Sequence, residues 1–151
     1  MKVVLDTDIL STFARINRLD VLNRLFDKVI VPPSVISELR KAEIKFGSLD
    51  SEVARLTRNE LLTLKGMDAR LGRGERECLA IAKHRNFPLA SNDRIVHSIC
   101  EKEGVGYFDL PRLLRFAILK KVVAREEAMQ LVNLIEHEER TVIVRKGEIF
   151  K

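Results

Sequence analysis

The sequence predicts an α/β fold, a three-layer sandwich in which helices cover both faces of a central, mainly parallel sheet of four to five strands. Short apolar runs alternate along the chain with segments of helical spacing, which is the pattern of strand–helix units in a parallel sheet. The chain has 151 residues, 46% of them hydrophobic, which suits one domain with one core. We therefore expect a single domain over residues 1–151.

The first half of the chain divides into units with clear boundaries. Each apolar run is short and ends at a polar residue or a proline. Pro32 ends the second run, and Pro33 is well placed in the first turn of a helix. We expect strands over residues 3–5 and 28–31, helices over residues 9–16, 20–26 and 33–42, and an amphipathic segment over residues 52–64.

The second half continues the alternation after a loop that contains Gly66, Gly72 and Gly74. The segment over residues 110–123 is apolar on almost every side, which predicts deep burial or a subunit contact. We expect helices over residues 75–84, 92–103, 110–123 and 125–138, and strands over residues 87–90, 106–108 and 141–145.

The charge balance gives a weak indication of the partner. The chain carries 27 Lys and Arg against 22 Asp and Glu, a net charge of +5, which favours polyanionic partners. It has no Trp and one Tyr, so a nucleic-acid surface built on stacked aromatic rings is poorly supported. Phosphate contacts by Lys and Arg remain open.

Several other classes are disfavoured. No run approaches the roughly 20 apolar residues that span a bilayer, and Asp6 interrupts the first apolar run before a signal sequence forms. Cys78 and Cys100 lack the spacing of a zinc site or a disulfide framework and are expected to be buried. We expect a soluble, cytoplasmic protein with no membrane partner.

Four acids stand where chemistry is expected in such a fold. Asp6 closes the first strand, Glu75 opens a helix after a glycine, and Asp93 follows a later strand. Strands of a parallel sheet end at one edge, where loops enter the following helices and sites form. Glu38 borders the face of its helix that is expected to pack on the sheet, where a carboxylate must be paired, protonated or ligated.

Each acid also has a simpler interpretation, as a helix cap or a first-turn charge. Glu77 is the rival of Glu75, and we favour Glu75 because it shares a helix face with Cys78 and Leu79, the expected inward side, whereas Glu77 points nearly opposite. Four carboxylates that converge on one edge would repel one another. Mg²⁺ or Mn²⁺, which prefer oxygen ligands, would neutralise them and support hydrolysis of a phosphodiester.

These residues resemble the PIN-domain superfamily of metal-dependent nucleases, especially the VapC-like toxin ribonucleases and their prokaryotic relatives. The resemblance covers most of the chain as an ordered pattern. Its motifs are Val-Val-Leu-Asp6-Thr7, Val29-Ile-Val-Pro-Pro-Ser-Val-Ile-Ser-Glu38-Leu, Gly72-Arg-Gly-Glu75-Arg-Glu-Cys-Leu-Ala-Ile-Ala-Lys and Pro88-Leu-Ala-Ser-Asn-Asp93.

The resemblance implies a ribonuclease in which bound Mg²⁺ or Mn²⁺ activates the attacking water. It also implies RNA as substrate, a homodimer and, for a toxin, an antitoxin protein as partner. The implied metal ligands, acting directly or through waters, are Asp6, Glu38, Glu75 and Asp93. The implied supporting residues are Thr7, Ser91 and Asn92.

The chain departs from the family pattern at three points. Asp8 stands where Asn or Ser is common, and it either caps the helix or crowds the site. Val96 occupies a position where some members carry a further acid, which puts a second metal in doubt. Glu75 replaces the more common Asp, and its longer arm favours contact through water.

A basic loop precedes the third acid. Lys65, Arg70, Arg73 and Arg76 lie where they could hold the phosphates of RNA, and the alternative is an ordinary solvated loop. The three histidines have no ligand spacing, so no role is assigned to them.

Two other functions compete with the nuclease. A haloacid-dehalogenase-like phosphatase would use Asp6 as nucleophile, but Leu10 and the lone carboxylate of Asn92-Asp93 depart from that pattern. A non-catalytic PIN-like module that binds RNA or a protein partner is the second alternative.

Overall fold

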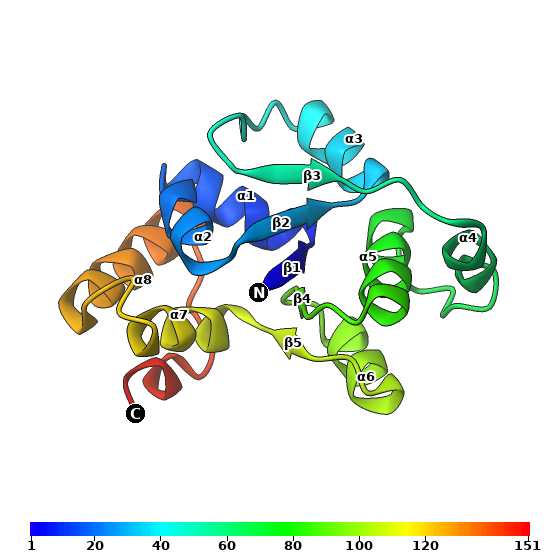
Figure 1. Cartoon of the computed structure of the whole chain (residues 1–151). Coiled ribbons are helices and arrows are strands. Elements are labelled where there is room, and N and C mark those ends of the chain that lie inside the picture. The colour runs from blue at the N-terminus through cyan, green and yellow to red at the C-terminus, as the bar shows by residue number, and fades with distance from the viewer.

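The computed structural model describes residues 1–151, and its centre is a five-stranded sheet in which every neighbouring pair is parallel (Figure 1). The order across the sheet is β3-β2-β1-β4-β5. This confirms the predicted fold class. The strands are β1 (Lys2–Leu5), β2 (Lys28–Val31), β3 (Ser51–Val53), β4 (Leu89–Ala90) and β5 (Tyr107–Phe108).

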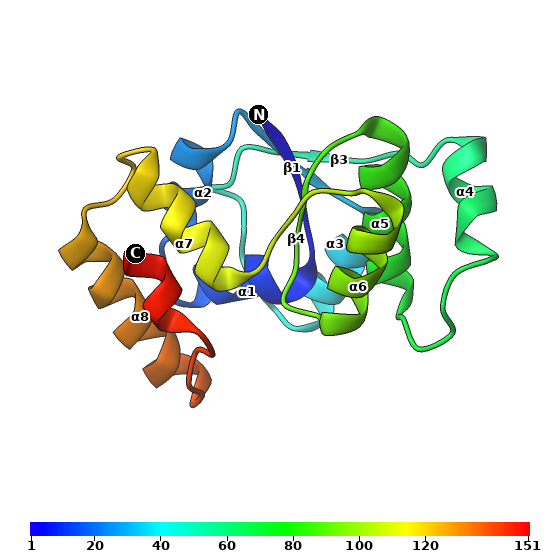
Figure 2. The ribbon, with the colours of Figure 1, turned by 90° about the horizontal axis from the view of Figure 1, so that it is seen from below.

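The helices cover the sheet from both sides. In both ribbon views α5 and α6 lie on one side with α4 outside α5, while α1, α2, α7 and α8 lie on the other (Figures 1 and 2). Helix α3 packs against both α1 and α5. The helices are α1 (Thr7–Arg15), α2 (Leu19–Leu25), α3 (Pro33–Lys41), α4 (Arg58–Leu64), α5 (Arg73–Arg85), α6 (Arg94–Glu103), α7 (Leu110–Leu119) and α8 (Arg125–Glu139), followed by the 3₁₀ turn η1 (Lys146–Phe150).

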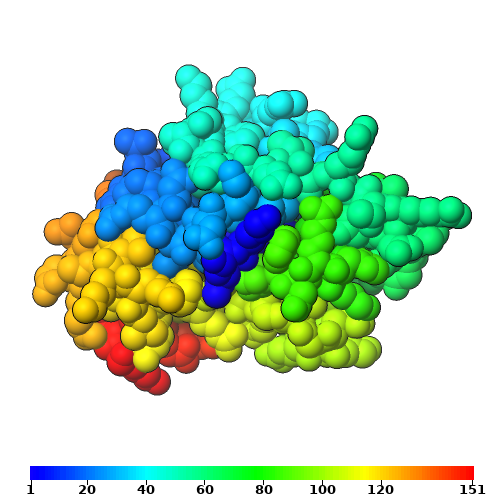
Figure 3. Space-filling view, in the orientation of Figure 1, coloured from blue at the N-terminus to red at the C-terminus, as the bar shows by residue number.

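The strand order places a crevice beside β1. The chain moves from β1 to β2 and β3 in one direction and then returns to add β4 and β5 on the other side of β1. In open parallel sheets, such a reversal opens a crevice at the carboxyl ends of the strands. Leu5 of β1 and Ala90 of β4 are register partners, so the residues that follow them emerge together. The amino end of β1 is exposed on the opposite edge of the sheet, in the middle of the face seen in Figure 3.

One hydrophobic core of 40 buried residues holds these layers together. Val3, Val4 and Leu5 are fully buried, because helices cover both faces of a parallel sheet and leave no solvent-facing side to its central strand. Helix α7 buries one face in this core and leaves Leu119 exposed, so it is mainly a core helix. Both cysteines are buried, as predicted. None of the helices is long and apolar enough to cross a membrane.

Three segments differ from the prediction. The amphipathic segment over residues 52–64 contains the end of β3 and then α4, which begins after Thr57 with a capping box to Glu60. β3 is an edge strand that pairs only with β2 and leaves Glu52 and Val53 exposed, so it lacks a buried apolar run.

The prediction of a strand over residues 141–145 is wrong. Val142 and Val144 are exposed, while Ile143 between them is buried in the core. This alternation resembles that of a strand, but the segment lies beside α7 and α8 and pairs with no strand. Helix α7 also ends at Leu119 rather than at residue 123.

Candidate metal centre

A pocket of about 280 Å³ lies at the carboxyl ends of β1 and β4, and no hydrophobic residue lines it. Five carboxylates from four segments of the chain meet there: the junction of β1 with the first turn of α1, helix α3, the first turn of α5 and the turn after β4. The lining residues are Asp6, Thr7, Asp8, Glu38, Glu75, Asn92 and Asp93. The structure thus brings together the four predicted acids, two of the predicted supporting residues and Asp8.

Asp6 is the most buried of these acids, with 5% of its surface exposed. Its Oδ1 accepts a hydrogen bond from Thr7 N (2.7 Å) and its Oδ2 accepts one from Ser91 Oγ (3.0 Å). Burial raises the pKa of Asp6 to about 7, the charges of Asp8 and Glu75 add to the rise, and the two hydrogen bonds oppose it. A bound cation would therefore stabilise the ionised form of Asp6.

Asp93 caps the neighbouring helix and is tied to Asp6 through a serine. Its Oδ1 accepts hydrogen bonds from Ile95 N (2.8 Å) and Val96 N (3.1 Å), and its Oδ2 accepts none. Its backbone N–H donates to Oγ of the fully buried Ser91 (3.2 Å), which in turn donates to Asp6. Ser91 therefore sets the spacing of the two aspartates at adjacent strand ends.

Glu38 reaches the pocket from α3, and its residue is exposed rather than buried as expected. Its Oε2 accepts a hydrogen bond from Thr7 Oγ1. A Cβ atom built on Gly74 would lie 2.7 Å from Glu38 Oε1 and 3.4 Å from a methyl group of Val35. Only glycine at position 74 lets α5 approach α3 this closely without moving the carboxylate.

Glu75, in the first turn of α5, is half-buried and lines the pocket. Its Oε2 accepts a weak hydrogen bond from Gly72 N (3.3 Å). Burial raises the pKa of Glu75, and the negative charges of Asp93, Asp8 and Glu38 raise it further.

Glu77 lies outside the pocket, but the expectation that it points away from the interior is wrong, because only 3% of it is exposed. Its Oε1 accepts a hydrogen bond from Ser34 N (2.9 Å), and its Oε2 accepts from Ser34 Oγ (2.7 Å) and Arg73 Nε (2.8 Å). Helix α5 packs on α3 as well as on the sheet, so it has two inward faces. Glu77 therefore joins α5 to the amino end of α3.

Asp8 lies in the pocket with both carboxylate oxygens engaged. They accept hydrogen bonds from Ile9 N (2.8 Å) and Asn92 N (3.2 Å). The surrounding protein raises the pKa of Asp8 by desolvating its carboxylate and the charge of Asp93 adds to the rise, while the backbone hydrogen bonds oppose it. Asp6, rather than Asp8, is the N-cap of α1. Asp8 therefore adds charge to the pocket.

The pocket fits a divalent cation in charge and in chemistry. None of its five acids forms an ion pair with Lys, Arg or His. The donors are oxygens, which Mg²⁺ and Mn²⁺ prefer. No three His, Cys, Asp or Glu side chains form a closed ligand set as they lie.

The three arginines predicted to contact RNA do not line this pocket. Arg70 pairs with Asp68 (2.6 Å), Arg73 pairs with Glu77 (2.8 Å), and Arg76 makes one long hydrogen bond to the Asp68 carbonyl (3.4 Å). Hydrogen bonds and charge from Asp68 raise the pKa of Arg70, and the charge of Asp93 adds a smaller rise. Arg70 is thus within electrostatic reach of the pocket.

Two contacts behind the pocket carried no signal in the sequence. Nε2 of His97 lies against the carbonyl oxygen of Ser91, and its ring stacks on Tyr107 with the centroids 4.5 Å apart. Asn92 Oδ1 accepts a hydrogen bond from Leu110 N (2.9 Å). Both contacts join residues that are distant in sequence, so they depend on the folded arrangement of β4, α6 and α7.

A family model described as a PIN domain matches residues 2–142. The chain belongs to the PIN-domain family. PIN domains are generally nuclease folds and generally use divalent metals. Membership of this family therefore disfavours the haloacid-dehalogenase-like phosphatase, in which Asp6 would be the nucleophile.

One solved structure shares this fold. The chain is similar to a PilT N-terminus domain protein from the hyperthermophilic archaeon Sulfolobus solfataricus P2, at 18% identity and a TM-score of 0.58, over 78% of this chain and 94% of that one. It is also similar to a domain of a functionally unknown protein from Methanocaldococcus jannaschii DSM 2661, at 24% identity and a TM-score of 0.46, over 72% and 90%. A comparison with curated proteins finds no match.

Proposed function

We propose that this PIN domain is a metal-dependent endoribonuclease that hydrolyses RNA phosphodiester bonds with Mg²⁺ or Mn²⁺ at the carboxylate pocket. The observation that carries the proposal is the meeting of five acids from four segments with no basic partner. Mutual repulsion disfavours such a pocket unless it takes up a cation or protons. The general association of PIN domains with nuclease activity supports the proposal.

The side chains divide into ligands and supports. Asp6, Glu38, Glu75 and Asp93 would hold the ion, directly or through waters, with Asp8 beside them. When bound, the ion supplies the Lewis acidity that ionises the attacking water and offsets charge on the phosphoryl oxygens. Ser91 fixes Asp6 relative to Asp93, and Thr7 orients Glu38, so the ligands are held before the ion arrives.

The phosphates of the RNA need cationic contacts beside the acids. Among the three loop arginines, Arg70 is the most exposed, with 69% of its side chain accessible against 62% for Arg73, while Arg76 is half-buried. Arg73 is held by Glu77, and Arg76 lies against the Asp68 carbonyl, so both contribute to the loop structure as well as to its positive charge. We assign Arg70 the leading phosphate contact in this loop.

The test is cleavage of a panel of labelled RNAs in Mn²⁺, in Mg²⁺ and in EDTA. We expect cleavage in either metal, none in EDTA, and loss of cleavage in Asp6→Asn and Asp93→Asn. Asp50→Asn is the matched control, because Asp50 is an exposed aspartate paired with Lys28 and lies outside the pocket. Equal turnover by wild type, Asp6→Asn and Asp93→Asn would reject the enzyme and favour a binding module.

The resemblance to toxin ribonucleases extends the proposal to a toxin of a toxin–antitoxin pair, acting in the cytoplasm as a homodimer with an antitoxin partner. A small antitoxin-like reading frame next to this one is the expected genetic signature. Light scattering of the purified protein measures its mass directly, and a monomeric mass would reject the homodimer.

A further inference from the structure

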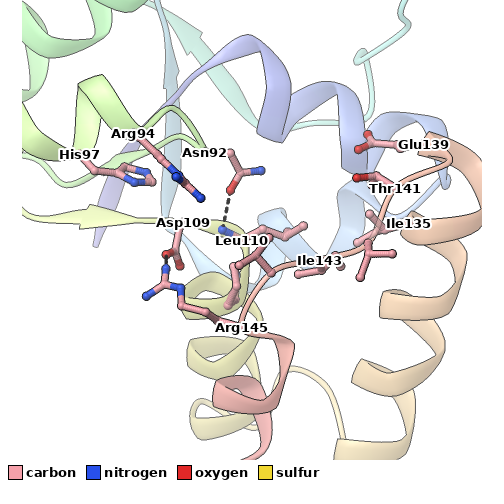
Figure 4. Close-up of a pocket in the computed structure, with 13 residues that line it drawn as sticks. Asn92, Arg94, His97, Asp109, Leu110, Ile135, Glu139, Thr141, Ile143 and Arg145 are labelled. Carbon is pink, nitrogen blue, oxygen red and sulfur yellow. Dashed lines mark hydrogen bonds and ion pairs between the residues drawn. The ribbon is translucent and has the colours of Figure 1, made fainter.

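A second pocket, of about 480 Å³, opens beside the metal centre (Figure 4). It lies between the start of α6, the start of α7, the end of α8 and the segment of residues 141–145. Its volume falls in the range of small-molecule sites, roughly 300–1,000 Å³. Neither the proposed metal ligands nor the loop arginines line it.

The two pockets meet at Asn92, which lines both of them. The Asn92 backbone N–H donates to Asp8 in the metal centre (3.2 Å), and its side-chain oxygen accepts from Leu110 N in the second pocket (2.9 Å). Arg94, in the second pocket, follows Asp93 directly in sequence. A polymer held at the metal centre would therefore pass Asn92 to enter the second pocket.

The second pocket has one cation without an acidic partner. The Arg94 guanidinium points toward Asn92 (Figure 4), is exposed, and makes no ion pair or hydrogen bond. Arg145 is paired with Asp109, whose charge it neutralises. Glu139, at the far end of the pocket, accepts a hydrogen bond from Thr12 Oγ1 (2.6 Å).

An apolar floor lies below this cation. Leu110 and Pro111 come from the first turn of α7, and Ile143 comes from the segment that follows α8. A nucleotide carries a phosphate on one side and a sugar and flat base on the other. The free guanidinium is complementary to the phosphate, and the apolar side chains are complementary to the sugar and base. His97, stacked on Tyr107, also lines the pocket and closes the edge near Arg94.

We propose that this pocket binds the nucleotide adjacent to the scissile phosphodiester of a single-stranded RNA, with Arg94 contacting its phosphate. Cleavage of the neighbouring phosphodiester rests on the proposed function, whereas binding of the nucleotide does not. Binding can therefore be measured without cleavage, by fluorescence anisotropy of a short labelled single-stranded RNA in EDTA.

Arg94→Ala should weaken this binding about tenfold, because a charged hydrogen bond to phosphate is lost. The slope of log affinity against log salt concentration should fall by about 0.7 in magnitude, the value for one phosphate contact on a single strand. Arg58→Ala is the matched control, because Arg58 is the first residue of α4, as Arg94 is of α6, and is likewise exposed and unpaired. It lies on the projecting α4, away from the pocket (Figures 1 and 3).

A second pair of variants tests the pocket without touching Arg94. Val144→Glu places a negative charge on the exposed wall of the pocket, and Val53→Glu places one on the exposed edge strand β3. Only Val144→Glu should weaken RNA binding. The subsite would be overturned if Arg94→Ala and Arg58→Ala changed RNA affinity equally, or if Val144→Glu and Val53→Glu did so. It would also be overturned if the wild type bound no RNA.

The outcomes separate this proposal from the proposed function. If Arg94→Ala weakens binding but no RNA is cleaved in Mn²⁺, the nucleotide subsite stands and the nuclease fails. If RNA is cleaved but Arg94→Ala binds as the wild type does, the nuclease stands and the subsite is wrong. Labelled single-stranded DNA of the same sequence serves as a third arm. Because RNA and DNA share the phosphate that Arg94 contacts, Arg94→Ala should weaken the binding of both, and an effect of Arg94→Ala on neither would overturn the contact.

Discussion

Replacing Asp6 with Asn should stabilise the metal-free protein at high pH while removing its response to metal. Asp6 has a pKa of about 7 in the folded protein against an ordinary value of 3.8. Between these two values the folded protein keeps a proton that the unfolded chain releases, so rising pH lowers the free energy of unfolding. The full cost of ionising Asp6, above pH 7, is about 4 kcal/mol at 1.36 kcal/mol per pKa unit.

Asparagine has no charge and avoids this cost. Its oxygen can still accept the hydrogen bond from Thr7 N, but its amide group faces Ser91 Oγ, which loses an acceptor at a cost of about 1 kcal/mol. The hydrogen-bond loss does not vary with pH. From pH 5 to pH 8 the advantage of Asp6→Asn over the wild type should therefore grow by about 3 kcal/mol, the part of the ionisation cost that develops in that interval.

The assay is urea unfolding in EDTA at pH 5 and pH 8, followed by the same measurement at pH 8 with Mn²⁺. We expect Mn²⁺ to stabilise the wild type, because a ligand that binds the folded state shifts the equilibrium, and to leave Asp6→Asn nearly unchanged. Asp50→Asn, which removes an exposed ion pair, should differ little from the wild type at either pH. A difference between Asp6→Asn and wild type that stays constant with pH in EDTA would refute the account of a desolvated, cation-dependent Asp6.

Three further predictions concern neighbouring residues. Gly74→Ala should displace Glu38 and weaken Mn²⁺ binding about tenfold in calorimetry, whereas Gly66→Ala, with open space around it, should not. Glu77→Gln should lower the free energy of unfolding by about 1–3 kcal/mol in urea, because a buried pairing with Arg73 and Ser34 is weakened. Burial raises the pKa of both cysteine thiols, that of Cys100 to about 11, so a disulfide reagent should modify them only after unfolding.

Each of these has a contradicting outcome. Equal Mn²⁺ affinity in the two glycine variants would mean that Glu38 is not a ligand. An unchanged unfolding curve for Glu77→Gln would mean that the pairing of Glu77 with Ser34 and Arg73 contributes nothing to stability. Rapid modification of the folded protein would show that a thiol is accessible.

The sequence was sufficient to predict the sheet where strands are central. β1 and β2 are continuous apolar runs because both of their faces are covered, and this pattern is recognisable without a structure. β3 has no such pattern, because an edge strand takes its hydrogen bonds from one neighbour and leaves its side chains in solvent. The segment over residues 141–145 has an alternating pattern with no strand to pair with, so alternation alone was misleading there.

The meeting of Asp6 and Asp93 was also predictable, because both follow strands that end at one edge of the parallel sheet. The environment of each acid was not. Glu77 is buried because α5 contacts α3 as well as the sheet. The spacing of apolar residues along a helix does not show which other helix will pack against its remaining faces. The pairing of Arg73 with Glu77, and of Arg70 with Asp68, likewise follows from rotamers and packing rather than from composition.

The central claim is that the carboxylate pocket binds the ion that supports RNA hydrolysis, and the most direct test is the rate of cleavage of one labelled RNA as Mn²⁺ is titrated. We predict no cleavage in EDTA, a rate that saturates over the same Mn²⁺ range that stabilises the wild type against urea, and no metal-dependent cleavage in Asp93→Asn. Cleavage in EDTA, or a wild-type rate in Asp93→Asn, would contradict the claim.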